Sequence, residues 1–233
     1  MFKILNMKNA LCLFVLLFSF SALSQERLAL KNVDQNKLLK DIVYTYNGND
    51  QITILYWFPV VYWEIMSAKD PKIITPEVIS QLKQMLGNKS IFFAVSGKLN
   101  TNTQLFEAKD ESYLRSNISV VYNGKTYKPI ADAKLPEELK MLNDYIKPMF
   151  SQMLGDMGSG LSIFYFEVVD NTGQNLLDPY SGLDYSLALG ALKNTFHLPL
   201  PSLFKDSKCT NDGELFPANY EFCPYHGSKL ITQ

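Results

Sequence analysis

Two short stretches near the end of the chain, Cys209-Thr210-Asn211-Asp212-Gly213 and Cys223-Pro224-Tyr225-His226-Gly227, share one pattern. In each, a cysteine is followed after two residues by a side chain that can bind a metal, and then by glycine. Two tight turns of this kind can direct Cys209, Asp212, Cys223 and His226 at one ion, the usual tetrahedral arrangement around zinc. The glycines suit such turns because a backbone folding round a metal often needs positive φ. The sequence therefore predicts a zinc site held by these four residues.

The stretch Cys209–Leu230 resembles the zinc-ribbon family, small domains built from two CPxCG-type knuckles. Cys209 and Cys223 fall on the first ligand of each knuckle, whereas Asp212 and His226 stand where the family most often has cysteine. The resemblance implies a small zinc-ribbon-like β-hairpin module over residues 205–233, with a structural zinc site. Carboxylate and imidazole should hold the metal less tightly than thiolates would. Leu215 and Leu230 are expected to cover the site.

A disulfide between Cys209 and Cys223 is the competing interpretation. Cleavage of an N-terminal signal over residues 1–24 would remove Cys12 and leave these two of the three cysteines, and an even number in an exported chain first suggests a bridge. Such a bond would stabilise the fold by about 3 kcal/mol in the chain-entropy model. It excludes metal binding, since a bonded sulfur is not a thiolate ligand. It would explain the two cysteines but not the matching positions of Asp212, His226 and the glycines.

The N-terminus indicates export. Residues 1–24 contain Lys3 and Lys8, an apolar run over Ala10–Phe20, and small residues at Ala22 and Ser24 spaced for signal peptidase. The apolar run is shorter than the roughly 20 residues that a membrane-spanning helix needs. We therefore expect a cleaved signal peptide and a periplasmic or extracellular protein without a stable membrane span; an uncleaved anchor is the alternative.

The charge pattern argues against nucleic acid as a partner. The chain has 22 basic and 23 acidic residues, and Arg27 and Arg115 are its two arginines. A nucleic-acid-binding protein would be expected to show a clustered basic face, whereas the lysines here are scattered. The partner is therefore expected to be a protein or a small molecule, of a kind that the composition does not identify.

Three segments have helical signals. Asp34 can cap a helix whose apolar spacing continues to Tyr46, and Thr75-Pro76 is a strong start for a helix that Gly87 ends. The third runs over Leu135–Leu154, with Pro148 expected to kink it, and Gly155–Gly160 should form a turn after it.

Strand signals alternate irregularly with these helices. The clearest is a hairpin over Ile118–Pro129, whose Asn123-Gly124 suits a two-residue turn. One further strand is expected to begin at Ile52 and to end before Pro59. Others are expected over Ser90–Leu99, Leu161–Val169 and Tyr185–Leu189. This order predicts an α+β domain over residues 25–204, with a mixed or antiparallel sheet, hairpins and two to three packed helices.

No strong catalytic signature accompanies the metal motif. His197 has no ligand at metal-binding spacing, and Trp57, Tyr62 and Trp63 fit core packing better than a ligand groove. The leading hypothesis is therefore a non-enzymatic exported protein with a structural or interaction role. The alternatives are a hydrolase-like envelope enzyme with a site near Trp57–Trp63 or His197, and a disulfide-stapled binding protein.

Overall fold

The computed structural model describes residues 25–48, 50–100, 102–103 and 105–232, so the predicted signal peptide over residues 1–24 lies outside the described residues. None of the described helices is both long and apolar enough to cross a membrane. With η marking a 3-10 helix, the elements in chain order are η1 (Leu30–Asn32), α2 (Gln35–Ile42), β1 (Val43–Gly48), β2 (Gln51–Trp57), α3 (Val60–Lys69), α4 (Pro76–Leu86), β3 (Ser90–Leu99), β4 (Phe106–Ala108), α5 (Glu111–Asn117), β5 (Ile118–Tyr122), β6 (Lys125–Tyr127), η2 (Asp132–Lys134), α6 (Glu137–Met153), η3 (Gly155–Gly160), β7 (Ser162–Phe166), β8 (Tyr185–Leu189), β9 (Leu192–Phe196), η4 (Pro201–Leu203), β10 (Ser207–Lys208), β11 (Leu215–Phe216) and β12 (Ile231–Thr232).

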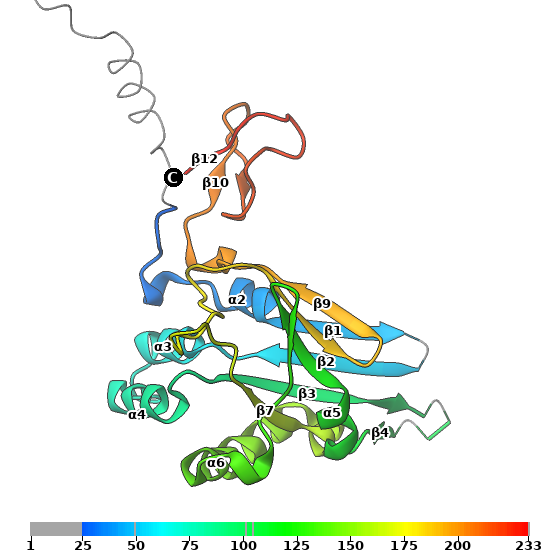
Figure 1. The fold of residues 1–233 in the computed structure, drawn as a ribbon. Helices are drawn as coiled ribbons and strands as arrows, with labels where there is room; N and C mark the ends of the chain where they lie inside the picture. Colours follow the sequence, from blue (N-terminus) through cyan, green and yellow to red (C-terminus); the bar gives the residue numbers. More distant parts are fainter. Residues whose placement is uncertain (1–24, 49, 101, 104, 233) are drawn as a thin grey trace, which may run out of the picture.

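A five-stranded antiparallel sheet forms the centre of the body (Figure 1). Strands β1, β2 and β3 lie side by side, and β3 is long enough to have two further partners. Its first half pairs with β7, with Phe92 opposite Phe164, and its second half pairs with β4, with Lys98 opposite Glu107. The buried, apolar β3 is therefore the central strand of the domain.

Helices α3 and α6 pack on one face of this sheet, and a second sheet with the order β6-β5-β8-β9 packs on the other. Phe150 of α6 packs against Phe93 of β3, with ring centroids 4.9 Å apart. On the opposite face, Tyr185 of β8 packs edge-on against Trp57 at 5.3 Å and Phe92 at 6.2 Å. Because neighbouring strand residues point to opposite faces, Phe92 and Phe93 belong to different layers of the core. The fold is α+β, as the sequence predicts.

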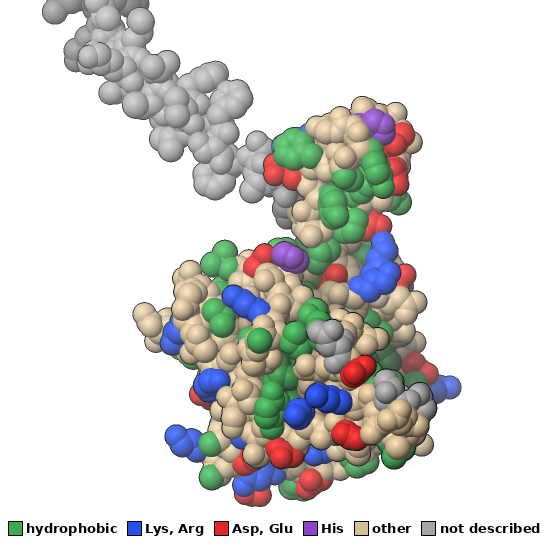
Figure 2. Space-filling view, turned by 90° about the vertical axis from the view of Figure 1, so that its right-hand side faces the viewer, with side chains coloured by type: hydrophobic (Ala, Val, Ile, Leu, Met, Phe, Trp, Pro, Cys, Tyr) green, Lys and Arg blue, Asp and Glu red, His purple; other side chains and the backbone are tan. Residues whose placement is uncertain are grey.

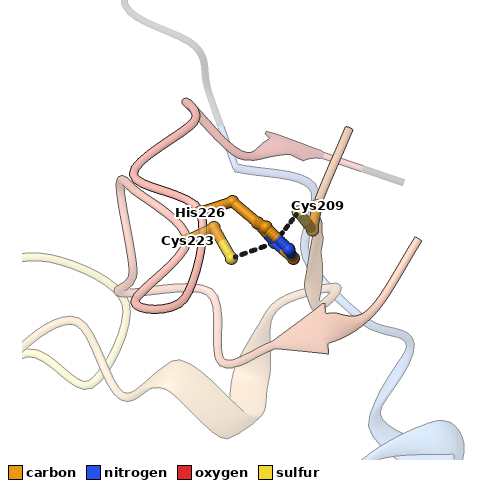
Figure 3. Close-up of side chains that lie close together, drawn as sticks. All are labelled: Cys209, Cys223 and His226. Carbon is orange, nitrogen blue, oxygen red and sulfur yellow. Dashed lines mark hydrogen bonds between the residues drawn. The ribbon is translucent and has the colours of Figure 1, made fainter. Parts of the chain in front are cut away.

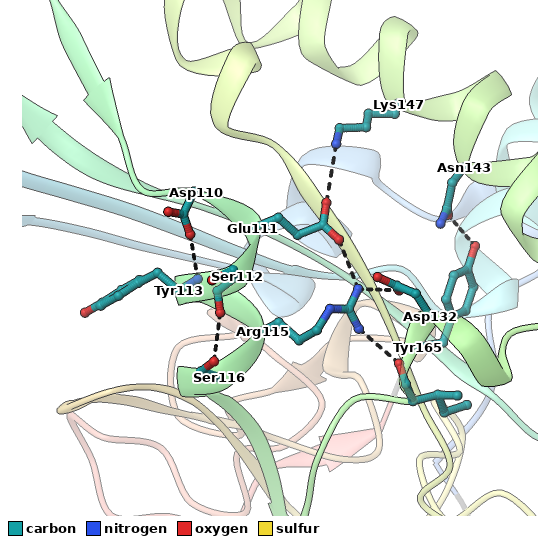
Figure 4. A network of polar contacts seen from close by, with 11 residues as sticks. Asp110, Glu111, Ser112, Tyr113, Arg115, Ser116, Asp132, Asn143, Lys147 and Tyr165 are labelled. Atoms are coloured by element: carbon teal, nitrogen blue, oxygen red, sulfur yellow. Dashed lines mark hydrogen bonds and ion pairs between the residues drawn. The ribbon is translucent and has the colours of Figure 1, made fainter.

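Arg115 of α5 joins several elements at one edge of the body (Figure 4). Its guanidinium donates to Glu111 at 3.0 Å, to Asp132 at 2.6 Å and to the Ile130 carbonyl at 3.0 Å. It also lies over the Phe164 ring, 5.0 Å from the centroid. One side chain therefore connects α5, the loop before α6 and strand β7.

The local signals that depend on a single backbone conformation are confirmed. Asn123 and Gly124 have φ of 45° and 76° in the turn between β5 and β6. The Thr75 side chain accepts a hydrogen bond from the Val78 N–H at the start of α4. The strand predicted over Ser90–Leu99 is β3. The segment Gly155–Gly160, predicted as a turn, is instead a 3-10 helix. Pro148 lies inside α6, and the kink expected there stays a prediction.

The helix predicted over Asp34–Tyr46 is too long. Asp34 caps α2 by accepting from the N–H groups of Asn36 and Lys37, but the helix ends at Ile42. Residues 43–46 are β-branched or aromatic and pair with β2 as strand β1, with Val43 opposite Tyr56. Tertiary pairing therefore outweighs the helical spacing of these residues. The sequence predicts neither α3, which follows Pro59, nor α5.

The C-terminal residues 205–232, called the module below, dock on one end of the body (Figure 1). The Lys205 N–H donates to the Glu26 carbonyl at 2.9 Å, and the Gln25 side chain donates to the Ala218 carbonyl. Ala218 is buried and packs against the core of the body. Gln25 and Glu26, the first described residues, therefore help to hold the module in place.

Candidate metal centre

The module contains a small antiparallel sheet in which β10 lies between β11 and β12. Ser207 is opposite Phe216 on one side and Thr232 on the other, and Lys208 is opposite Leu215 and Ile231. The sequence predicts only a hairpin here. The last residues of the described chain add β12 as a third strand, which fixes the C-terminal end of the module.

Two knuckles, residues 208–216 and 222–230, are built alike. In the first, the Cys209 N–H donates to the Glu214 carbonyl at 2.8 Å and the Gly213 N–H donates to the Cys209 carbonyl at 3.0 Å. The second knuckle has the same two bonds at the same spacing. The Cys223 N–H donates to the Ser228 carbonyl and the Gly227 N–H donates to the Cys223 carbonyl, each at 2.8 Å. The repeated sequence pattern is therefore also a repeated backbone geometry, in which each residue has its counterpart fourteen positions later.

The two glycines close these turns. Gly213 has φ of 80° and Gly227 has φ of 64°, a region that side chains with a Cβ rarely adopt. Each N–H is thereby turned back toward the carbonyl of the cysteine that begins the knuckle. The positive φ predicted from the pattern is confirmed at both positions.

The knuckles bring three ligand atoms together (Figure 3). The Nδ1 atom of His226 lies 3.5 Å from the Sγ atom of Cys209 and 3.5 Å from that of Cys223. All three ligand atoms lie within 4.8 Å of one another, so this group could hold a metal ion. The two thiols are buried and are not joined to each other.

Asp212, the fourth predicted ligand, lies at the edge of this group, where its carboxylate contacts Cys209 and His226. Its Oδ2 atom is 3.5 Å from His226 Nδ1, and its Oδ1 atom accepts a hydrogen bond of 2.9 Å from the Glu214 N–H. The Asp212 and His226 side chains are 40% and 38% exposed, whereas both cysteines are buried. The sulfur atoms of the centre therefore lie on its buried side, and the Asp212 and His226 side chains lie on its solvent-exposed side.

The surroundings of Cys209 favour its thiolate form. Burial alone would raise the pKa of this thiol, but hydrogen bonds from the backbone N–H groups of Asn211 and Asp212 and from Ser228 lower it overall. The Ser228 hydroxyl lies 3.7 Å from the sulfur. A thiolate is the form of cysteine that binds metal. Ser228 is not among the residues that the motif predicts, although it directly follows Gly227.

The apolar cover of the centre differs from the prediction. Cys209 and Cys223 form a buried cluster with Phe216 and Leu230, which are counterparts in the two knuckles. Leu215 is 47% exposed and points away, so the expectation that it covers the site is wrong, whereas Leu230 is buried as expected. Because side chains alternate along β11, the neighbouring Phe216 takes the inward position.

His197 pairs with Asp184, a contact that the spacing of residues in the sequence does not indicate. Its Nδ1 atom lies 2.7 Å from Asp184 Oδ2, and it lines a cleft of about 220 Å³ with Asp41 at the foot of the module. Trp57 and Trp63 are core residues, as the packing interpretation predicts, while Tyr62 is partly buried against that core. The two indole rings therefore serve core packing, while Tyr62 also lines a cleft of about 490 Å³.

Comparison of the chain with protein-family models, curated proteins and solved structures gave no match. The chemistry of the module therefore rests on its own geometry. Two buried thiols and an imidazole converge on one point, and a carboxylate lies at the rim. This arrangement can bind a metal ion and thereby cross-link the two knuckles.

Proposed function

We propose that the chain is an exported binding protein whose module folds round one zinc ion and contacts a protein partner through the second knuckle. The observation that carries the proposal is a difference between the two knuckles. Phe222 and Tyr225 are 53% and 73% exposed in the second, and their counterparts in the first are Lys208 and Asn211. The knuckle fold thus accepts polar residues at both positions.

Zinc is the ion that best suits the donor set. With typical bond lengths of about 2.3 Å to sulfur and about 2.0 Å to nitrogen, a tetrahedral zinc separates these two ligands by about 3.6 Å. The separations from His226 Nδ1 to the two sulfurs are both 3.5 Å. Thiolate and imidazole donors also favour zinc over the oxygen-seeking ions calcium and magnesium. Cys209, Cys223 and His226 would hold the ion, with Asp212 as the further predicted ligand.

Exposed aromatic side chains favour an interaction surface. Phe and Tyr are enriched at the cores of protein interfaces, where they contribute large contact areas. Hydrophobic side chains are visible on the surface of the module above the body (Figure 2). Burying them against a protein partner would remove apolar surface from water, which supports a binding role for the second knuckle.

Export is supported by the sequence of residues 1–24, with its basic start, apolar run and small residues before Gln25. A metal bound to Cys209 and Cys223 would also keep the two thiols from oxidising in such a compartment, because a coordinated thiolate is occupied. The scattered lysines favour a protein partner over nucleic acid.

Site-specific photo-crosslinking in the native host tests the binding role. A photoreactive amino acid at position 225 should capture one defined protein, whereas the same amino acid at the structural counterpart, position 211, should capture far less. Replacing the exposed pair by the residues of the first knuckle, Phe222→Lys and Tyr225→Asn, should reduce binding of that protein at least about tenfold without loss of metal.

Equal capture from positions 211 and 225 would contradict the proposal, because contact would then reflect proximity and not the aromatic surface. Unchanged binding by the Phe222→Lys, Tyr225→Asn variant would contradict it as well. Zinc content and the thermal unfolding curve of the variant serve as controls, since both should match the unsubstituted protein.

A further inference from the structure

The solvent-exposed side of the centre indicates a coordination position at which one ligand can be replaced by another. Cys209, Cys223 and His226 form a group in which all ligand atoms lie within 4.8 Å of one another, and Asp212 is not part of it. Three protein ligands with a fourth position open to another molecule are typical of zinc sites that react, whereas structural sites are closed by four. The position of Asp212 decides between these two kinds of site.

Asp212 is held in place by interactions that do not need the metal. Its Oδ1 atom accepts the 2.9 Å hydrogen bond from Glu214 N–H, which closes a local turn in the chain. Its Oδ2 atom faces His226 Nδ1 at 3.5 Å. The carboxylate can therefore leave a bound metal without losing its local partner, and water can solvate it because the side chain is 40% exposed.

The cysteines have no such freedom. Both are buried in one apolar cluster with Phe216 and Leu230, so no external ligand can approach from that side. His226 lies between the two sulfurs at 3.5 Å from each, which places its Nδ1 atom within the tight group. Displacement is therefore confined to the side of the centre where Asp212 meets solvent.

We propose that Asp212 is a displaceable ligand and that a small external thiolate can take its place on the metal. In this exchange the bond from zinc to the Asp212 oxygen breaks, a bond from zinc to the incoming sulfur forms, and the proton of the thiol passes to solvent. Zinc keeps its charge and its coordination number. The mixed complex gives the metal a route out of the module to a thiol-bearing acceptor, so the centre exchanges metal as well as stabilising the fold.

This inference rests on the proposed zinc centre, and cobalt substitution tests the two separately. The full chain is stripped of metal, loaded with Co²⁺ and titrated with 2-mercaptoethanol. The sulfur-to-cobalt charge-transfer band should rise about 1.5-fold and then saturate, because the thiolates on the metal increase from two to three. Asp212→Asn keeps an oxygen acceptor for the Glu214 N–H, so it tests ligation without removing the turn.

Asp212→Asn should weaken Co²⁺ binding by less than about tenfold and should still give the thiol-dependent rise, whereas Cys223→Ser should weaken binding by more than about a hundredfold. Glu221→Gln, an exposed carboxylate of the module, is the matched control and should behave as the unsubstituted chain. Transfer of zinc to a chromogenic chelator should also become faster with added thiol in the unsubstituted chain.

Two results overturn the inference in distinguishable ways. If Co²⁺ binds but the spectrum does not respond to thiol, and Asp212→Asn loses the metal as completely as Cys223→Ser does, the centre is closed by four protein ligands and the proposed function stands. If the unsubstituted chain binds no Co²⁺, the zinc-folded module and the exchange both fail.

Discussion

Asp212 and His226 occupy matching positions in the two knuckles and meet across the centre, with Asp212 Oδ2 3.5 Å from His226 Nδ1. One residue is a carboxylate and the other an imidazole, so neither adds a thiolate to the two cysteines. The pair makes one side of the centre oxygen- and nitrogen-bearing and partly exposed, while Cys209 and Cys223 keep the other side buried. These two residues would therefore leave a metal bound here open to solvent on one side.

The apolar cover should make a measurable contribution to the metal centre. Phe216→Ala removes a buried ring that packs with both cysteines, and we expect it to destabilise the module by about 3 kcal/mol. Leu215→Ala, one residue earlier and exposed, should change stability by less than about 0.5 kcal/mol. Limited proteolysis of the module across a chelator titration measures both. Equal sensitivity of the two variants would show that the cover is assigned to the wrong residue.

Replacing Asp41 by a neutral residue should stabilise the body by an amount that depends on pH. Burial raises the pKa of this carboxyl above 3.8, although the Ser202 N–H donates to it at 2.9 Å and Lys37 and His197 lie near enough to oppose the shift. A raised folded-state pKa means that its stabilising contribution is present below the unfolded pKa and is lost as pH rises through the folded value. At neutral pH the charged group therefore costs stability.

Asp41→Asn keeps an oxygen for the Ser202 N–H and removes the charge, so it should raise the melting temperature of the body at pH 7. The gain should shrink as pH falls toward the raised pKa of Asp41, because the original carboxyl then becomes neutral too. Calorimetric melting curves between neutral and mildly acidic pH provide the comparison. A loss of stability that grows as the pH rises through the pKa of Asp41 would contradict this, because the ionised carboxylate would then support the fold.

Arg115 should not be replaceable by lysine. Its fork bonds Glu111, Asp132 and the Ile130 carbonyl while the guanidinium lies over Phe164, a geometry that a single ammonium group cannot reproduce (Figure 4). We expect Arg115→Lys to destabilise the body by about 1–2 kcal/mol in urea unfolding.

The matched control for Arg115 is Lys147→Ala, which removes only the outer ion pair to Glu111 at 3.7 Å and should cost less than about 0.5 kcal/mol. If Arg115→Lys proves as mild as this control, the network contributes little beyond surface charge.

The sequence predicts the parts of this structure that depend on local chemistry. Asn123-Gly124 and Thr75-Pro76 set a turn and a helix start through backbone preferences that tertiary contacts do not change. Val43–Tyr46 shows the opposite case, since its spacing fits a helix and its pairing with β2 makes it a strand. Such a choice depends on residues distant in the chain, so local spacing does not reveal it.

The candidate site follows the same division. The recurrence of cysteine, a possible ligand and glycine predicts the knuckles, and the convergence of Cys209, Cys223 and His226 agrees with it. The prediction that Leu215 and Leu230 both cover the site is wrong for Leu215. Equivalent residues of the two knuckles are fourteen positions apart, so the counterpart of Leu230 is Phe216, which is the buried one. The rim position of Asp212 depends on the three-dimensional path of the first knuckle, which the ligand spacing alone does not specify.

Native mass spectrometry of the mature protein, purified without added reductant or chelator, tests the central claim that one zinc ion joins the two knuckles. We expect a mass about 63 Da above that of the reduced metal-free chain, one zinc less two thiol protons, with both thiols free after denaturation. A mass about 2 Da below the reduced metal-free chain, showing a bond between Cys209 and Cys223, would contradict it.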